Sequence, residues 1–203
     1  MQTSRLEAFS DGVFAIAITL LVIEIAVPHV SEGGLARALA EQWPSYAAYA
    51  VSFAVIGIMW VNHHGLLDLI ERVDRPLLFL NLLLLLFVAF VPFSTALLAE
   101  YLLRPAPDSS VAAAVYSANG VANAIGFNVI WRYLVRDGRL LQPDLDVEAL
   151  RRRSRRFGLG LIVYPITVAL AFVSAPLTLA VHALLAGYYV VDQLATSPRL
   201  SAR

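Results

Sequence analysis

The residues of this 203-residue chain best suited to chemistry lie near the ends of two apolar segments: Ser10 and Asp11 in the first, His63 and His64 in the second. A carboxylate and a histidine can exchange protons, because histidine titrates near neutral pH. Histidine also ligates metals, but adjacent residues on a helix point about 100° apart, so His63 and His64 cannot both bind one ion without unwinding. The pattern favours proton binding or hydrogen bonding over a metal site.

The composition of the chain is that of a membrane protein. Hydrophobic residues make up 59% of the sequence, charged residues only 15%, and the mean hydropathy is +0.71. The absence of cysteine excludes disulfides, thiolate metal sites and cysteine nucleophiles. At about 20 residues per membrane-spanning helix, the length accommodates six spans with short loops. We therefore predict an all-α, multi-pass membrane protein with one domain, residues 1–203.

Long apolar runs, ended by prolines and glycines, predict where the six transmembrane helices lie. The expected spans are about 6–27, 44–66, 76–99, 109–133, 157–174 and 176–195. Arginines in short loops stay on the cytoplasmic side. With the N-terminus inside, thirteen arginines are cytoplasmic and only Arg37 and Arg104 are outside. Both termini are therefore predicted to be cytoplasmic.

This topology places seven polar residues at one depth, in the inner third of the bilayer at about 1.5 Å of rise per residue. They are Ser10 and Asp11 on the first helix, Trp60, Asn62, His63 and His64 on the second, and Asn81 on the third. A carboxylate in a membrane needs a partner, and for Asp11 we expect His63, His64, Asn81 or an arginine. The cluster serves either to hold the three helices together or to sense protons.

A stripe of aliphatic residues follows the opposite face of the first helix. Helical projection aligns Gly12, Ile16, Leu20 and Ile23, with Thr19 on the flank. Such a stripe is typical of a lipid-facing or core surface, and periodicity alone assigns it no other role.

The motif Arg5-x-x-x-Phe9-Ser10-Asp11 opens the first of the six segments and is followed by Ile16 and Thr19. Together with Trp60, Asn62 and two histidines at the end of the second segment, it resembles the prokaryotic transmembrane protein 175 family. Members of this family are potassium-permeable channels related to the endosomal and lysosomal potassium channel of animals. The architecture is similar along the whole chain, and the specific motif is concentrated in residues 5–23.

The resemblance implies that the first helix of each subunit lines a central pore, and that four subunits form a homotetramer. Ile16, Leu20 and Ile23 would form hydrophobic rings that act as the gate, and Thr19 a ring of hydroxyls. No T-V-G-Y-G filter is present, so we expect hydroxyls to confer only modest selectivity for potassium. Glu24 would lie at the outer mouth and attract cations, or would be a solvated interfacial charge.

The remaining residues of the motif would hold the pore helix in place. The resemblance assigns this anchoring to Arg5, Phe9, Ser10 and Asp11, which would bind the second and third helices through Trp60, Asn62, His63, His64 and Asn81. We expect no cofactor, and no metal beyond permeating potassium.

Other polar residues are interpreted more simply. The arginine-rich segment Arg151–Arg156 is an orientation signal that can also hold anionic lipid head groups, with no reason to invoke nucleic acid. Asn119 and Asn123 are expected to form hydrogen bonds between helices, and His182 to be a packing residue. The expected location is the cell membrane of a prokaryote.

Two rival functions are kept for comparison. A proton-coupled transporter would use Asp11, His63 and His64 as its proton carriers. A membrane enzyme would need a nucleophile, a base and an oxyanion site close together, and the sequence beside the histidines contains no such motif. We therefore expect a channel and no enzymatic activity.

Overall fold

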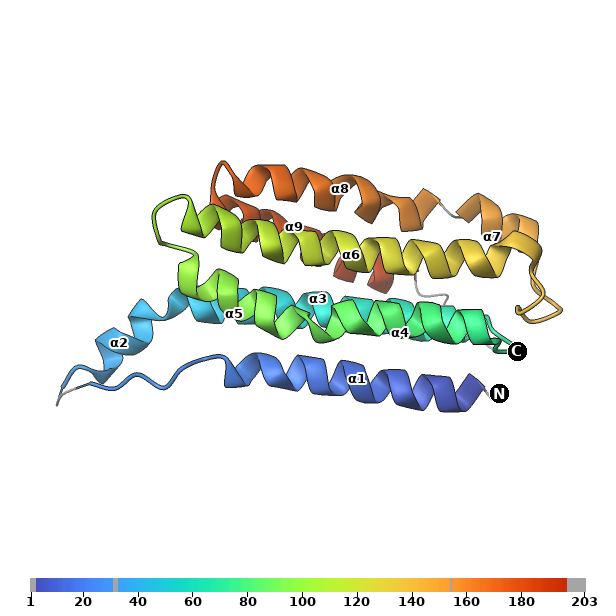
Figure 1. The fold of residues 1–203 in the computed structure, drawn as a ribbon, viewed down its shortest axis with the longest axis horizontal. Helices are drawn as coiled ribbons and strands as arrows, with labels where there is room; N and C mark the ends of the chain where they lie inside the picture. The colour runs from blue at the N-terminus through green and yellow to red at the C-terminus, as the bar shows by residue number, and fades with distance from the viewer. Residues whose placement is uncertain (1–2, 31–32, 154, 197–203) are drawn as a thin grey trace.

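The computed structural model describes residues 3–30, 33–153 and 155–196, and helices dominate them (Figure 1). In chain order the helices of these ranges are α1 (Thr3–Ile23), α2 (Leu35–Glu41), α3 (Trp43–Leu67), α4 (Arg75–Ala89), α5 (Val91–Tyr101), α6 (Asp108–Asp137), α7 (Val147–Arg153), α8 (Arg155–Ala171) and α9 (Ala175–Thr196). The short helices α2 and α7 lie in connections between longer ones.

Two of the expected spans differ from the observed helices, and a proline lies near each difference. Helix α1 stops at Ile23 rather than at the expected residue 27, and the Ala26 carbonyl accepts a hydrogen bond from Gln42 at 2.8 Å. Pro28 disfavours helical geometry at the residue before it, Val27, so the helix does not continue to the expected end. The third expected span is divided into α4 and α5 at Phe90. Pro92 has no N–H to donate to the preceding turn, so the ladder of backbone hydrogen bonds is interrupted there.

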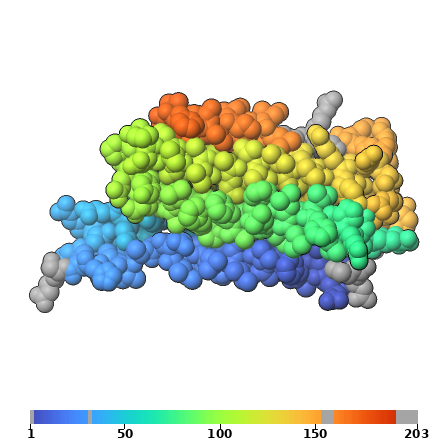
Figure 2. Space-filling model, viewed as in Figure 1, coloured from blue at the N-terminus to red at the C-terminus, as the bar shows by residue number. Residues whose placement is uncertain are grey.

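The long helices run antiparallel in layers, with α1 at one edge (Figure 1). Helices α3, α4 and α5 pack directly against α1, followed by α6 and α9, and α8 lies outermost against α6. The start of α1 and the end of α9 lie at the same end of the bundle (Figure 1). In the space-filling view, α1 forms an outer border of the molecule (Figure 2).

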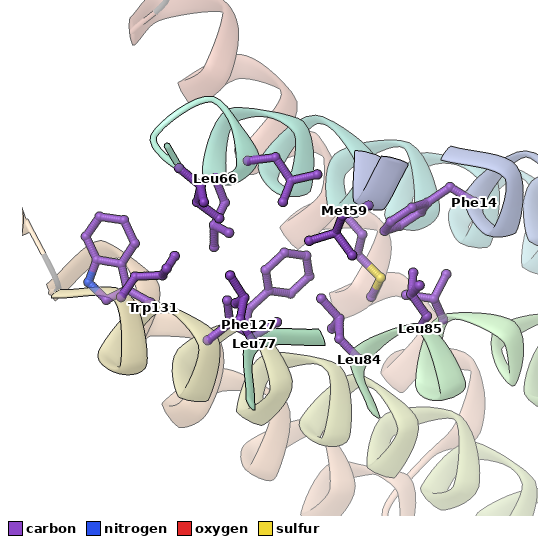
Figure 3. Packing of buried hydrophobic residues seen from close by; sticks show 14 of the residues in the cluster. Phe14, Met59, Leu66, Leu77, Leu84, Leu85, Phe127 and Trp131 are labelled. Atoms are coloured by element: carbon purple, nitrogen blue, oxygen red, sulfur yellow. The ribbon is translucent and has the colours of Figure 1, made fainter. Parts of the chain in front are cut away.

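A hydrophobic core joins α1, α3, α4 and α6. Figure 3 shows side chains from all four helices packed together: Phe14, Met59, Leu66, Leu77, Leu84, Leu85, Phe127 and Trp131. Gly126 lets α6 approach α4 closely, because a Cβ there would lie 3.0 Å from Leu84 Cδ1. Burial of these side chains fixes how the helices are rotated against one another.

Three helical segments in the described part of the chain are long and apolar enough to cross a membrane: Thr3–Ile23, Trp43–Leu67 and Arg75–Tyr101. Gly160–Ala171 and Ala175–Val191 are shorter apolar helices. Helix α6 has 30 residues but is less apolar, and Ser117, Asn119 and Asn123 on it are buried. Helix α6 packs against α4, α5, α8 and α9, so its packed faces can carry buried polar residues that bond to its neighbours.

At the end of the bundle where α1 begins, Asp74 joins α4 to the end of α6. Its Oδ1 accepts a hydrogen bond from the Leu77 N–H at 3.0 Å and so caps α4. Its Oδ2 accepts hydrogen bonds from the Tyr133 hydroxyl and from Arg139 Nη2, both at 2.5 Å. Partial burial raises the pKa of Asp74, but these three donors stabilise the carboxylate more, so the pKa falls below its ordinary value of 3.8.

We expect Asp74→Asn to be less stable than the wild type by about 1 kcal/mol at pH 7, because asparagine keeps the cap but loses the charge. A carboxyl whose pKa is lowered by folding stabilises the protein above its unfolded pKa, and this contribution is lost as the pH falls through the folded pKa. The thermal unfolding temperatures of the two proteins in detergent should therefore converge below about pH 4. Asp144→Asn, in an exposed segment, is the control. A difference that is constant with pH would contradict the assignment.

Candidate functional site

Helix α1 has one face buried in the subunit and one exposed. The buried residues are Leu6, Ser10, Phe14, Ala17 and Leu21, which recur at helical spacing. On the other face, Ile16 is 61% exposed, Leu20 is 40% exposed and Ile23 is 71% exposed. The protein therefore leaves uncovered the stripe for which the family resemblance implies a pore-lining role.

A chain of hydrogen bonds ties the buried face of α1 to α4 and α3. The Ser10 hydroxyl donates to the Leu6 carbonyl at 2.9 Å and accepts from Asn81 Nδ2 at 3.0 Å. The Asn81 carbonyl oxygen then accepts from His63 Nε2 at 2.7 Å. The chain requires the His63 proton on Nε2, because Ser10 has already committed its only hydrogen and Asn81 must present its oxygen to the ring. Three residues predicted as one network thus lie in direct contact.

The partner of Asp11 differs from the expected one. Its Oδ1 accepts a hydrogen bond from the indole Nε1 of Trp60 at 2.9 Å, rather than from His63, His64, Asn81 or an arginine. Indole is a donor only, so the pairing satisfies the Trp60 N–H and one oxygen of the carboxylate. The sequence placed Trp60 in the cluster but did not indicate this pairing, because the rotation of α3 against α1 decides which side chain meets the carboxylate.

The two adjacent histidines point to different surroundings. His63 is buried, with its ring centroid 5.3 Å from that of Phe14. His64 is exposed, and its Nδ1 lies 3.4 Å from a Glu7 carboxylate oxygen, with Asp68 at 3.9 Å from Nε2. This divergence agrees with the 100° separation of neighbours on a helix. In the ranges that the structure describes, no three His, Cys, Asp or Glu side chains are grouped to hold a metal.

Three further residues of the predicted anchoring set are Arg5, Phe9 and Asn62. Arg5 is exposed, and Phe9 is 55% exposed, seven and fourteen residues before Ile16 and Ile23 and therefore on the same face of α1. Asn62 is half-buried, next to His63. An anchoring role for these three residues remains a prediction, and for Phe9 it would require contacts outside the subunit.

Thr19 and Glu24 lie toward the other end of α1. The Thr19 hydroxyl is exposed and lies 2.8 Å from the Ala15 carbonyl oxygen and 3.0 Å from that of Ile16. Because carbonyls only accept, the hydroxyl hydrogen points into the helix and the oxygen lone pairs point away from it. Glu24 is exposed one residue after the last residue of α1.

The structure adds a second group of buried polar residues that the sequence interpretation did not bring together. Thr95 Oγ1 donates to Ser52 Oγ at 2.8 Å, and the Ser52 and Tyr116 hydroxyls are 2.9 Å apart. Asn119 Nδ2 donates to Ser94 Oγ at 3.4 Å, which confirms the expected hydrogen bond between helices for Asn119. In the sequence, these residues stand out only as polar residues within apolar segments. Because the group is assembled from three different helices, the sequence did not show which of them are hydrogen-bond partners.

Comparison with known proteins points to one family. Residues 5–92 match the family described as endosomal/lysosomal potassium channel TMEM175. A Streptomyces collinus protein named as a potassium channel is 58% identical over 99% of this chain and 98% of its own length. A potassium channel of Chamaesiphon minutus is 48% identical over 94% of both chains. The crystal structure of a lysosomal potassium-selective channel TMEM175 homolog from Chamaesiphon minutus superposes with a TM-score of 0.84, at 44% identity, covering 94% of this chain and 97% of that one.

Proposed function

Because this chain belongs to the TMEM175 family, we propose that it is a potassium-permeable channel in which α1 lines the pore of a homotetramer. The observation that carries the proposal is the position of α1 at the border of the subunit, with Ile16, Leu20 and Ile23 uncovered. Potassium is the permeant ion, and no cofactor is needed. Around a shared axis, the three residues of each subunit would form stacked hydrophobic rings.

The buried polar network supports this role for α1. Lipid would also tolerate an aliphatic stripe, so exposure alone does not distinguish a pore from a lipid-facing surface. The bonds from Ser10 to Asn81 and from Asp11 to Trp60, however, fix the rotation of α1 about its own axis. Ser10 and Asn81 are buried, and breaking a hydrogen bond between buried groups is costly, so their bond resists rotation more than the exposed Asp11–Trp60 bond does. A gate that works by diameter needs a helix held at a defined angle.

We further propose six membrane spans, with both termini cytoplasmic in the cell membrane. Helices α1, α3, the pair α4 and α5, α6, α8 and α9 would be the spans, and the packing of α6 against α4, α5, α8 and α9 accommodates its polar residues. The excess of arginine on one side supports the orientation. The beginning of α1 and the end of α9 lie at one end of the bundle, as six crossings require (Figure 1).

Anionic lipids are proposed to bind the arginine-rich segment Arg151–Arg156. Arg151 itself is excluded from this proposal, because its side chain is engaged elsewhere. The Arg151 guanidinium donates to the Val135 carbonyl at 2.8 Å and to the Arg136 carbonyl at 2.5 Å, so it caps the end of α6. Arg152 is exposed at the start of the remaining segment. The side chains of Arg153, Arg155 and Arg156 lie outside the described residues.

Selectivity is proposed to arise at Thr19. Its hydroxyl hydrogen is directed at backbone carbonyls, which leaves the oxygen free to accept a cation. Four such oxygens would replace part of the hydration shell of potassium, which releases water more readily than sodium does. A tenfold preference requires only about 1.4 kcal/mol, so we expect modest selectivity.

We expect Thr19→Val to reduce the potassium-to-sodium permeability ratio by roughly tenfold, toward unity, because valine has the same shape without the oxygen. Thr19→Ser keeps the oxygen and is the matched control. Reversal potentials under bi-ionic conditions measure the ratio. An unchanged ratio in Thr19→Val would place selectivity elsewhere.

Ion flux in liposomes separates the channel from the proton-coupled transporter. Purified protein should pass a current whose reversal potential follows the potassium gradient and does not shift with an imposed proton gradient. A transporter using Asp11, His63 and His64 would instead couple the flux of its substrate to protons. The absence of potassium current, or an image of the oligomer with a helix other than α1 on the axis, would refute the proposed function.

A further inference from the structure

A small cavity lies inside the subunit, among α3, α5, α6, α8 and α9 rather than beside α1. Its lining includes Met59, Ser94, Asn123, Tyr164 and His182. It has room for about one water molecule. The cavity is therefore separate from the exposed stripe of α1 and is lined in part by polar groups.

Two hydrogen-bond acceptors in this lining lack a partner. His182 Nδ1 lies 2.9 Å from the Thr178 carbonyl oxygen, so the neutral ring has its hydrogen on Nδ1 and a lone pair on Nε2. Asn123 Nδ2 donates to the Asn119 carbonyl at 3.0 Å, which leaves Oδ1 as an acceptor. Within the described residues, neither His182 Nε2 nor Asn123 Oδ1 has a hydrogen-bond partner. The two residues are 2% and 1% exposed, so bulk water does not reach them.

We propose that the cavity binds one water molecule, which donates one hydrogen to His182 Nε2 and the other to Asn123 Oδ1. Two acceptors cannot bond to each other, whereas water supplies two donors. Each buried polar group left unpaired is unfavourable, and buried waters are typically found where they satisfy such groups. A cation fits the site less well, because no carboxylate lines the cavity and a buried charge needs compensation.

The water would connect the C-terminal helix to the break between α4 and α5. Asn119, which accepts from Asn123, donates to Ser94 on α5, and the Ser94 hydroxyl donates to the Val91 carbonyl at 2.9 Å. Val91 is the first residue of α5, directly after that break. The bound water thus completes a line of hydrogen bonds from α5 through α6 to α9.

Radiolytic hydroxyl labelling of the full-length protein in oxygen-18 water tests the site. X-rays split a bound water beside the side chain that it touches, and Met59 lines the cavity while only 7% exposed. Trp131 is the comparison, because tryptophan, like methionine, reacts readily with hydroxyl radicals. Trp131 is 4% exposed and is not part of the cavity lining. We expect Met59 to be oxidised severalfold faster than Trp131. Equal rates would overturn the proposal.

Substitutions then test whether oxidation of Met59 depends on the two acceptors, Asn123 and His182. Asn123→Leu removes one acceptor and fills space, and His182→Phe keeps a ring but removes Nε2. Each should lower the Met59 rate to that of Trp131, and either variant suffices if the other does not fold. Asn128→Leu, at a buried position on α6 outside the lining, is the matched control and should leave the rate unchanged. An unchanged Met59 rate in the first two variants, or labelling that falls as potassium is raised, would overturn the water assignment. The measurement needs no current, so it fails or succeeds independently of the proposed channel function.

Discussion

Replacing Ile16 or Ile23 by alanine is expected to raise the resting potassium conductance by roughly tenfold or more, equivalent to lowering the barrier by about 1.4 kcal/mol. Both side chains lie on the uncovered face of α1, where four copies would narrow the pore. A ring of isoleucines resists wetting, and removing the branched end of each side chain widens the ring and admits water. Single-channel or liposome current at zero applied stimulus measures the effect.

Val22→Ala is the matched control for this prediction. Val22 is 53% exposed and adjacent to Ile23, but it points about 100° away from it around the helix. The control should therefore leave the conductance near that of the wild type. Equal conductance in Ile16→Ala, Ile23→Ala and Val22→Ala would mean that this face of α1 does not line the path.

Asn81→Leu should have the largest effect on stability, lowering the free energy of unfolding by about 2 kcal/mol or more. The substitution is similar in size, yet it removes the acceptor for His63 and the donor for Ser10. In double-mutant cycles, a hydrogen bond between membrane helices contributes on average only about 0.6 kcal/mol. Here the buried His63 Nε2–H would be left without an acceptor, while Ser10 would keep only its bond to the Leu6 carbonyl, which is why we expect the larger cost. Thermal unfolding of the detergent-solubilised protein measures it.

A triple variant separates the loss of hydrogen bonds from a loss of packing. In Ser10→Ala, His63→Phe, Asn81→Leu, all three members become apolar with similar shapes, and replacing every partner can be nearly neutral. We expect this variant to recover much of the stability that Asn81→Leu loses. If the triple variant is no more stable than the single one, the cost lies in packing. Potassium current from both variants shows whether the network also sets the angle of α1.

The sequence predicted best those features of the site that depend only on how deep each residue lies along its helix. The apolar runs and prolines located the helices, and the helical rise brought Ser10, Trp60, His63 and Asn81 to one level. The structure confirms that these residues form contacts between α1, α3 and α4. Periodicity also separated the aliphatic stripe of α1 from its polar face, since both follow from 100° per residue.

Which residues form hydrogen bonds with each other was harder to predict than which residues belong to the site. Asp11 bonds to Trp60 rather than to a histidine, and Asp74 receives both Tyr133 and Arg139 from more than fifty residues away. His182 looked like an ordinary packing residue, but its Nε2 lacks a partner in the described part of the chain. Each of these results depends on helices that are distant in sequence.

Composition and helical periodicity are local properties, so the amino-acid sequence was sufficient to predict the class of protein, the positions of the helices and the two faces of α1. The packing of the helices set which donor meets which acceptor, which faces of α6 are buried, and where a cavity remains between α6 and α9. The reason is that rotation and offset between helices are set by the joint packing of side chains such as Phe14, Leu84 and Phe127. A change of a few ångströms or tens of degrees in that packing exchanges one hydrogen-bond partner for another.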